Sequence, residues 1–242
     1  MKTNDLSSTN PRRKFIGSLA AGAAGIGLAM TLPKQLNAAP DEERYNDVSE
    51  ADEWFNKVKG KHRIMYDVPR PNEVFPFAWP RIFLVTNQHT GSPASDCGVV
   101  VVLRHEGIPY AFDDNIWAKY NFSEMFKKSG ELGHAFQAAD AATAAKTRNP
   151  FAHPAKGDFK VPAFGEVAIG INELQADGVM FCVCDAAITV YSTVVAGQMK
   201  MDAAEVKKDW MKGLLPGIQP VPSGVWAVGR AQEHKCAYCY AG

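Results

Sequence analysis

The stretch GVVVVL, residues 98–103, is an unbroken run of apolar and mostly β-branched residues. A second run of this kind, VMFCVC, follows at 179–184. Runs in which polar and apolar residues do not alternate are typical of strands covered on both faces, as in a parallel sheet. Parallel neighbours need crossover segments, and segments with helical spacing lie between and beyond these two runs. The sequence therefore predicts an α/β domain with a mostly parallel sheet and helices on both faces.

Shorter elements extend this pattern along the chain. Three further strands are expected at 63–68, 218–221 and 235–240. The segment 80–88 suits either a strand or a helix; we favour a helix that begins at Pro80, because a strand there would leave no crossover before 98–103. The stretch 149–165 contains three prolines and is interpreted as a long loop near one edge of the sheet. Other helices are expected around Val167, Ile171 and Leu174, and after caps at Asp185, Asp202 and Ser223.

The amino-terminal segment has the architecture of an export signal. Arg12 and Arg13 stand before an apolar stretch from about Phe15 to Leu32, and Asn37-Ala38-Ala39 offers small residues for cleavage. This pattern predicts a twin-arginine signal peptide over 1–39, recognised by the twin-arginine export machinery, and a bacterial periplasmic protein. The alternative is an uncleaved signal that anchors the chain in the inner membrane, since the apolar stretch is close to the shortest that spans a bilayer.

Length and charge narrow the class of protein. The chain has 242 residues, 46% of them hydrophobic, which is enough for a sizeable core. Five of its 26 basic and one of its 26 acidic residues lie in 1–39, which leaves 21 basic and 25 acidic residues and a net charge of −4. A nucleic-acid-binding surface needs a clustered excess of Lys and Arg, so we expect no nucleic-acid partner. Residues 40–60 are interpreted as a linker with a short helix around 51–58, followed by the α/β domain at 61–242.

Three segments of the chain are similar to those of a known family. VMFCVCDAAI (179–188) matches a strand that ends in a cysteine, and LLPGIQPVPSGVWAVGRAQEHKCAYCYAG (214–242) contains a Leu-Pro-Gly turn and a Val-Pro-Ser-Gly-Val loop. VVVVLRHEGIPYAF (99–112) matches a second strand and the loop after it. Together they resemble the DsrE/DsrF-like sulfur-relay family over roughly 62–242, with gaps. The resemblance implies a flavodoxin-like three-layer sandwich with a five-stranded sheet, homo-oligomers (trimers or hexamers), and persulfide sulfur carried on Cys184.

Two features depart from the family's pattern. The members that relay sulfur work in the cytoplasm, whereas this chain carries an export signal. The chain also has a long insertion at 120–165, and Cys236 and Cys239 lie in the last predicted strand, where sulfur carriers usually have apolar residues. These departures separate this chain from the cytoplasmic sulfur carriers.

Polar residues follow three of the predicted strands at the point where each strand ends. Ligands of open α/β sheets bind outside the carboxyl ends of the strands, so we expect these residues to converge. Cys184 would also begin a helix, whose N–H groups and dipole stabilise a thiolate, and Arg104 would act in the same direction. His105 is a candidate proton donor or metal ligand. The sequence thus identifies no cofactor, but it predicts a catalytic group of Cys184, His105 and Arg104 and binding contacts from Asp185, Ser223 and Gly224.

Each cysteine also has an alternative interpretation. Cys184 is equally consistent with a buried structural thiol, because free cysteine is among the most buried residue types. Cys182, expected on the same face of its strand, and Cys97 are interpreted as core residues. Cys236 and Cys239 are candidate metal ligands or a redox pair, but residues three apart on a strand point to opposite faces. This pair therefore closes only if the chain turns at that point.

Two functions compete at this stage. The first is a periplasmic protein that binds or transfers sulfane sulfur through Cys184, with a sulfur donor or acceptor protein as its partner. The second is a non-catalytic binding module that holds a metal, haem or a partner protein in an oligomeric scaffold. The sequence does not decide whether the protein is an enzyme.

Overall fold

The computed structural model describes residues 50–126, 135 and 146–242. The predicted signal peptide and most of the predicted linker lie outside the described residues, as does the middle of the insertion at 120–165. None of the helices in the described ranges combines the length and the apolar character that a membrane span requires.

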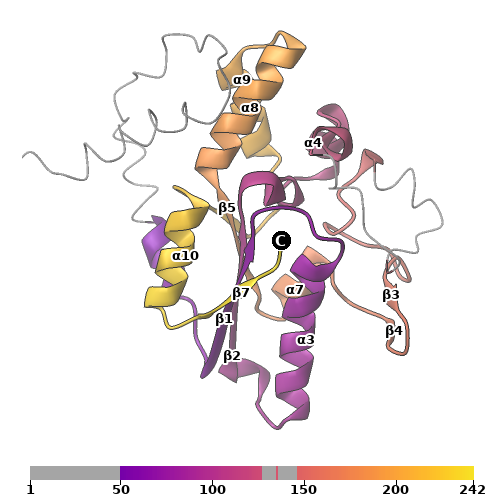
Figure 1. Ribbon diagram of the computed structural model, residues 1–242, viewed down its shortest axis with the longest axis vertical. Coiled ribbons are helices and arrows are strands. Elements are labelled where there is room, and N and C mark those ends of the chain that lie inside the picture. The colour runs from indigo at the N-terminus through magenta and orange to yellow at the C-terminus, as the bar shows by residue number, and fades with distance from the viewer. Residues whose placement is uncertain (1–49, 127–134, 136–145) are drawn as a thin grey trace, which may run out of the picture. The chain divides into compact units, whose positions relative to one another are not determined.

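The predicted parallel sheet is present and has five strands (Figure 1). Its order is β6-β5-β2-β1-β7, and each strand runs parallel to its neighbours. This arrangement confirms the α/β class and the flavodoxin-like sandwich. In chain order, β2, β5 and β6 follow one another on one side of β1, whereas the last strand, β7, pairs with the other side of β1. The strand order therefore reverses at β1. The strands are β1 (His62–Val68), β2 (Cys97–Leu103), β5 (Met180–Cys184), β6 (Ile218–Val221) and β7 (Ala237–Tyr240).

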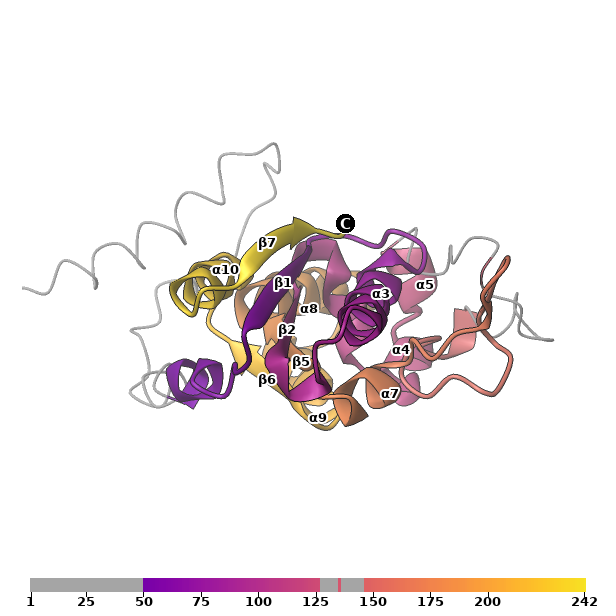
Figure 2. The same cartoon turned by 90° about the horizontal axis from the view of Figure 1, so that it is seen from below.

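One face of the sheet is covered by α3 (Phe75–His89), α7 (Ile171–Ala176) and the 3₁₀ helix η4 (His105–Ala111). Figure 2 shows α3 and α7 on the same side of the strands. Successive side chains of a strand point to opposite faces, so only every second residue of the apolar runs reaches these helices. The buried strand residues on this face are Tyr66, Val68, Val99, Val101, Leu103, Phe181, Val183 and Ile218, and Cys184 at the end of β5 belongs to the same cluster.

The opposite face is covered by α10 (Gly224–Glu233) and by a helix at 50–55 (Figure 2). The short helix expected around 51–58 is therefore part of the core: Phe55 is completely buried and its ring lies 5.9 Å from that of Trp226. The strand residues buried on this face alternate with those of the first face. They are Met65, Val100, Val102, Cys182 and Val221.

Two longer segments extend beyond the carboxyl ends of the strands. α8 (Asp185–Met199) and α9 (Ala203–Lys212) pack against each other at the top of Figure 1. Trp210 of α9 is buried in an aromatic cluster with residues from α4 (Asp114–Lys119), α5 (Phe122–Met125) and the segments beside them. Its ring lies 4.8 Å from that of Phe122 and 5.5 Å from that of Phe112. This cluster fixes α9 against the rest of the domain.

Two helices start earlier than the sequence predicts. α3 begins at Phe75 instead of Pro80, because Pro76 occupies the first turn, where a missing N–H leaves no hydrogen bond unmade. α8 is capped by Cys184 and not by Asp185, which is the first residue of the helix. The strand and the helix thus share Cys184 with no residue between them.

Other boundaries also differ. α7 excludes Val167, which follows a short hairpin of β3 (Lys160–Val161) and β4 (Gly165–Glu166) inside the stretch predicted to be an irregular loop. The last strand begins two residues later than predicted. Lys235 has a φ of 64°, in the left-handed region, and this turn separates α10 from β7.

Candidate functional site

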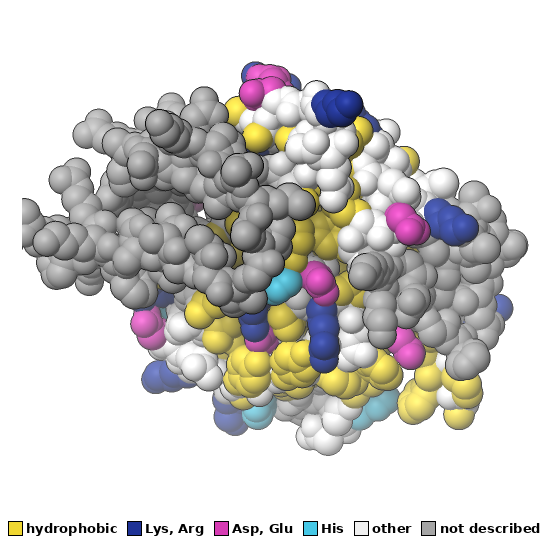
Figure 3. All heavy atoms as spheres, turned by 45° about the horizontal axis from the view of Figure 1, so that its top comes forward, with side chains coloured by type: hydrophobic (Ala, Val, Ile, Leu, Met, Phe, Trp, Pro, Cys, Tyr) yellow, Lys and Arg dark blue, Asp and Glu magenta, His cyan; other side chains and the backbone are white. Residues whose placement is uncertain are grey.

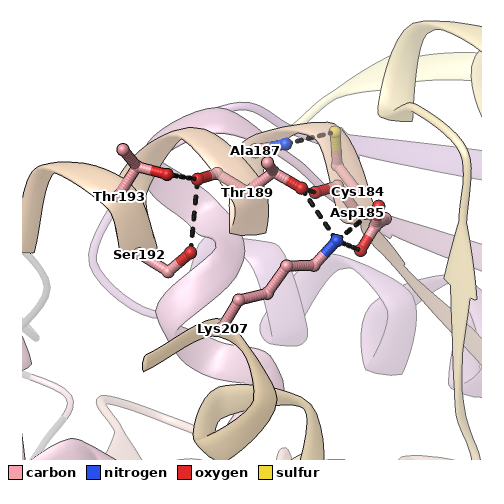
Figure 4. A network of polar contacts seen from close by, with 7 residues as sticks. All are labelled: Cys184, Asp185, Ala187, Thr189, Ser192, Thr193 and Lys207. Carbon is pink, nitrogen blue, oxygen red and sulfur yellow. Dashed lines mark hydrogen bonds and ion pairs between the residues drawn. The ribbon is translucent and has the colours of Figure 1, made fainter. Parts of the chain in front are cut away.

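Cys184 ends β5 and caps α8, the arrangement on which the predicted thiol chemistry depends. The backbone N–H of Ala187 donates to its Sγ at 3.3 Å (Figure 4). This N–H belongs to the first turn of α8, where backbone donors lack partners within the helix. Cys184 is 7% exposed, so its sulfur lies close to the surface without being open to it. A sulfur in this position accepts a hydrogen bond from the first turn of the helix. Its small exposed surface leaves room for contact with a small, unbranched reactant.

Asp185 is held by a lysine that the sequence did not single out. The Nζ of Lys207, on α9, lies 2.7 Å from Oδ1 and 3.0 Å from Oδ2 of Asp185. The same Nζ donates to Oγ1 of Thr189 at 2.9 Å, so one ammonium joins both helices beside Cys184 (Figure 4). Lys207 thereby neutralises the carboxylate that lies next to the sulfur. Asp185 is an ion-pair partner in this structure and presents no free carboxylate.

Arg104 lies at the end of β2 and is held by a buried carboxylate. Its Nε donates to Oδ1 of Asp67 at 2.6 Å and its Nη2 donates to Oδ2 at 2.9 Å. Asp67 is 2% exposed, and the hydroxyl of Tyr238 also donates to its Oδ2 at 2.8 Å. The hydrogen bond to Asp67 raises the pKa of Arg104, and the charge of the nearby Cys184 acts in the same direction. The guanidinium is thus fixed within electrostatic range of the sulfur.

Asp67 and Tyr238 were missed by sequence reasoning. Asp67 belongs to β1, where the strand order reverses, and Tyr238 comes from the neighbouring strand β7. The crevice at such a reversal is where open α/β sheets bind their ligands. The available signal was an aspartate inside the apolar strand MYDV (65–68), since a buried acidic residue needs a partner.

Ser223 and Gly224 both lie at the start of α10, as predicted, but in different roles. The Oγ of Ser223 accepts from the backbone N–H of Trp226 at 3.2 Å, so this hydroxyl is used as the helix cap. Gly224 lies against Arg104: a Cβ at this position would be 2.4 Å from the Cβ of Arg104. Glycine is therefore required for Arg104 to run along the start of α10.

His105 faces a different partner. Its Nδ1 lies 2.6 Å from the hydroxyl of Tyr191 on α8, and its backbone has a φ of 49°. Burial raises the pKa of Tyr191 to about 12, with a smaller contribution from Glu106, so the phenol keeps its proton at neutral pH. Tyr191 is seven residues beyond Cys184, which is about 10 Å along a helix axis. Arg104 interacts electrostatically with Cys184, whereas the hydrogen bond of His105 is to Tyr191.

The remaining cysteines divide between the two faces of the sheet. Cys182 is completely buried under α10, in a different core cluster from Cys184, and burial raises its pKa above the usual range. Cys236 is buried in the same cluster as Cys182, whereas Cys239 packs against the opposite one. All five cysteines are free. Among the described residues, no group of three or more His, Cys, Asp or Glu side chains is arranged to hold a metal ion.

Comparisons of this chain with protein-family models, with curated proteins and with solved structures found no match.

Proposed function

We propose that this protein carries sulfane sulfur on Cys184 as an exported member of the DsrE/DsrF-like family. The observation that carries the proposal is the position of this sulfur. It caps α8, accepts an N–H from Ala187, and lies within electrostatic range of an arginine fixed by Asp67. Both neighbours stabilise a negative charge on sulfur.

The proposed reaction is a sulfur transfer without net oxidation. The Cys184 thiolate attacks the outer sulfur of a donor persulfide, R–S–SH. A new S–S bond forms on Cys184 as the donor's S–S bond breaks, and the donor leaves as a thiolate, R–S⁻. The proton of the outer sulfur remains on the new persulfide or is lost to water, and an acceptor thiolate reverses the same step. A persulfide is unbranched at its end, which suits a sulfur that is only 7% exposed.

The proposal includes partners and a location. Export by the twin-arginine machinery would place the protein in the periplasm, where a sulfur donor or acceptor protein would meet it. The resemblance implies a homotrimer or homohexamer. Exposed apolar side chains support self-association: Val190 and Val194 on α8 are 55% and 49% exposed. Figure 3, with the top of Figure 1 tilted forward, shows hydrophobic side chains gathered in patches on the surface turned to the viewer, and such patches often mark interfaces.

A persulfide assay tests the role of Cys184. Wild type, Cys184→Ser and Cys97→Ser are exposed to sodium tetrasulfide, and each cysteine-containing peptide is examined by mass spectrometry. We expect a mass increase of one sulfur on the peptide of Cys184 in wild type and Cys97→Ser, and none on that segment in Cys184→Ser. Equal sulfur uptake by all three proteins would eliminate the proposal.

The alternative is a non-catalytic binding module for a metal, haem or a partner protein. No contact in the described residues specifically favours it. Elemental analysis and a visible absorption spectrum of untagged protein separate it from sulfur transfer, because a bound metal or haem gives a stoichiometric signal that a persulfide does not.

A further inference from the structure

A cavity of about 510 Å³ lies at the amino ends of the strands, opposite the end of the sheet that carries Cys184. It is bounded by the segment after the helix at 50–55, by α3, by the 3₁₀ helix η3 (Ala94–Asp96), by the start of β2 and by the turn before β5. Its volume is in the range of small-molecule sites in proteins. The residues assigned to sulfur transfer take no part in it.

The cavity wall combines an apolar surface with a cationic rim. Val85 of α3 is 37% exposed, and the other apolar lining residues are Val58, Leu84, Ala94, Val99, Ala176 and Met180. Three lining residues are cationic and one is acidic: Lys57, Lys59, Arg81 and Asp177. A wall that is partly apolar and carries excess positive charge fits a ligand that has a hydrocarbon body and one anionic group.

Arg81 is fixed at this rim. Its Nε donates to the backbone carbonyl of Ala168 and its Nη1 donates to the carboxylate of Asp177. That carboxylate offsets the charge of Arg81, so the excess positive charge comes from Lys57 and Lys59. Among the described residues neither lysine forms an ion pair.

The segment that carries the two lysines is held in place by close backbone contacts. Gly60 has a φ of 99°, and a Cβ there would lie 2.6 Å from the carbonyl carbon of Asp96. A Cβ on Gly98 would lie 2.2 Å from the carbonyl oxygen of Lys59. Two glycines thus allow this segment to cross directly over the start of β2. The backbone at the mouth of the cavity is part of the packed domain.

Cys97 supplies a chemical reporter inside the cavity. It is the first residue of β2, is only partly buried and lines the wall. Burial raises the pKa of its thiol, and Asp96 adds to this effect. Its alkylation at mildly alkaline pH therefore reports whether the cavity is filled.

We propose that this cavity is a second ligand site, which binds a small amphipathic anion such as an aromatic sulfonate or a medium-chain carboxylate. The apolar body contacts Leu84, Val85 and Met180, and the anionic group lies between Lys57 and Lys59. This site is independent of Cys184, so either proposal can fail without the other.

Anilinonaphthalene sulfonate is the probe, used with the protein as the cell produces it. We expect iodoacetamide labelling of Cys97 to fall at saturating probe, with labelling of Cys184 unchanged, and octanoate to displace the probe. Lys57→Glu/Lys59→Glu is expected to weaken binding about tenfold. The matched control Lys208→Glu/Lys212→Glu reverses two exposed lysines of α9, far from the cavity, and is expected to bind as wild type.

Leu84→Trp fills the cavity and is expected to abolish protection of Cys97 while the circular dichroism spectrum stays unchanged. The proposal is overturned if Cys97 remains fully reactive at saturating probe. It is equally overturned if the two lysine variants bind alike, because the probe would then be held by exposed apolar patches elsewhere.

Discussion

A cysteine lies at each end of the parallel strands, and the charges around the two cysteines differ: Cys184 is at the carboxyl end of β5 and Cys97 at the amino end of β2. At the carboxyl edge, Cys184 lies among charges that are paired with each other, Asp67 with Arg104 and Asp185 with Lys207. At the amino edge, Cys97 lies in a cavity whose lysines have no acidic partner among the described residues. The first edge suits chemistry on the sulfur itself, whereas the second suits binding of a separate molecule. The difference arises because the strands are parallel: helices such as α8 begin at the carboxyl ends of the strands, whereas the segments before β2 and β5 lie at the amino ends.

Of the substitutions around Cys184, Asp67→Ala is expected to lower the free energy of unfolding the most. It leaves Arg104 and Tyr238 without their shared acceptor. The side chain of Asp67 is 2% exposed and that of Arg104 26%, so we expect the free energy of unfolding to fall by about 2–3 kcal/mol. Lys207→Ala, which breaks the more exposed pair, is expected to lower it by about 1 kcal/mol. Urea denaturation measures both. Equal losses would show that the burial of Asp67 does not increase the contribution of its ion pair to stability.

Arg104→Gln is expected to lower the alkylation rate of Cys184 and to leave that of Cys97 unchanged. Removing a cation that interacts electrostatically with Cys184 is expected to disfavour the negatively charged form of its sulfur, so iodoacetamide should label Cys184 more slowly. Arg104→Lys keeps the charge but cannot form the same two-pronged contact with Asp67, and is expected to give an intermediate rate. Cys97 serves as the internal control, with an unchanged rate. An unchanged rate for Cys184 would remove Arg104 from the site.

Gly224→Ala tests the close contact between α10 and Arg104. The new methyl group displaces Arg104, so we expect a loss of about 1–2 kcal/mol in unfolding free energy and slower labelling of Cys184. The matched control is Gly229→Ala in the same helix, where a Cβ meets nothing within 4 Å. That change is expected to stabilise the protein by up to about 1 kcal/mol, because alanine favours helix. Similar effects of both variants would contradict the proposed contact.

Tyr191→Phe tests whether His105 belongs to the site, and its effect is expected to be the smallest. Labelling of Cys184 should not change. Because the pKa of Tyr191 is raised from 10.0 to about 12, the folded state holds its proton more tightly and stability falls between pH 10 and pH 12. Denaturation midpoints of wild type should therefore decline more steeply over this interval than those of Tyr191→Phe. Altered Cys184 labelling would place His105 at the sulfur.

Sequence reasoning succeeded where the physical cause is local. The runs at 98–103 and 179–184 became β2 and β5 because apolar residues without alternation are stable only when both faces are covered. Ser223 caps α10 as predicted, since the cap bonds a group three residues away. The helix that starts at the end of β5 was likewise predicted, although its cap is Cys184 and not Asp185.

By itself, then, the sequence determined the α/β class, most of the elements and the place of Cys184 between a strand and a helix. Only the tertiary structure decided which groups surround that sulfur. Tyr238 reaches Asp67 across 171 residues of chain, and Lys207 reaches Asp185 from another helix. The cavity at Cys97 is likewise assembled from five separate segments. Such contacts depend on how the elements pack, and no spacing along the chain records that packing.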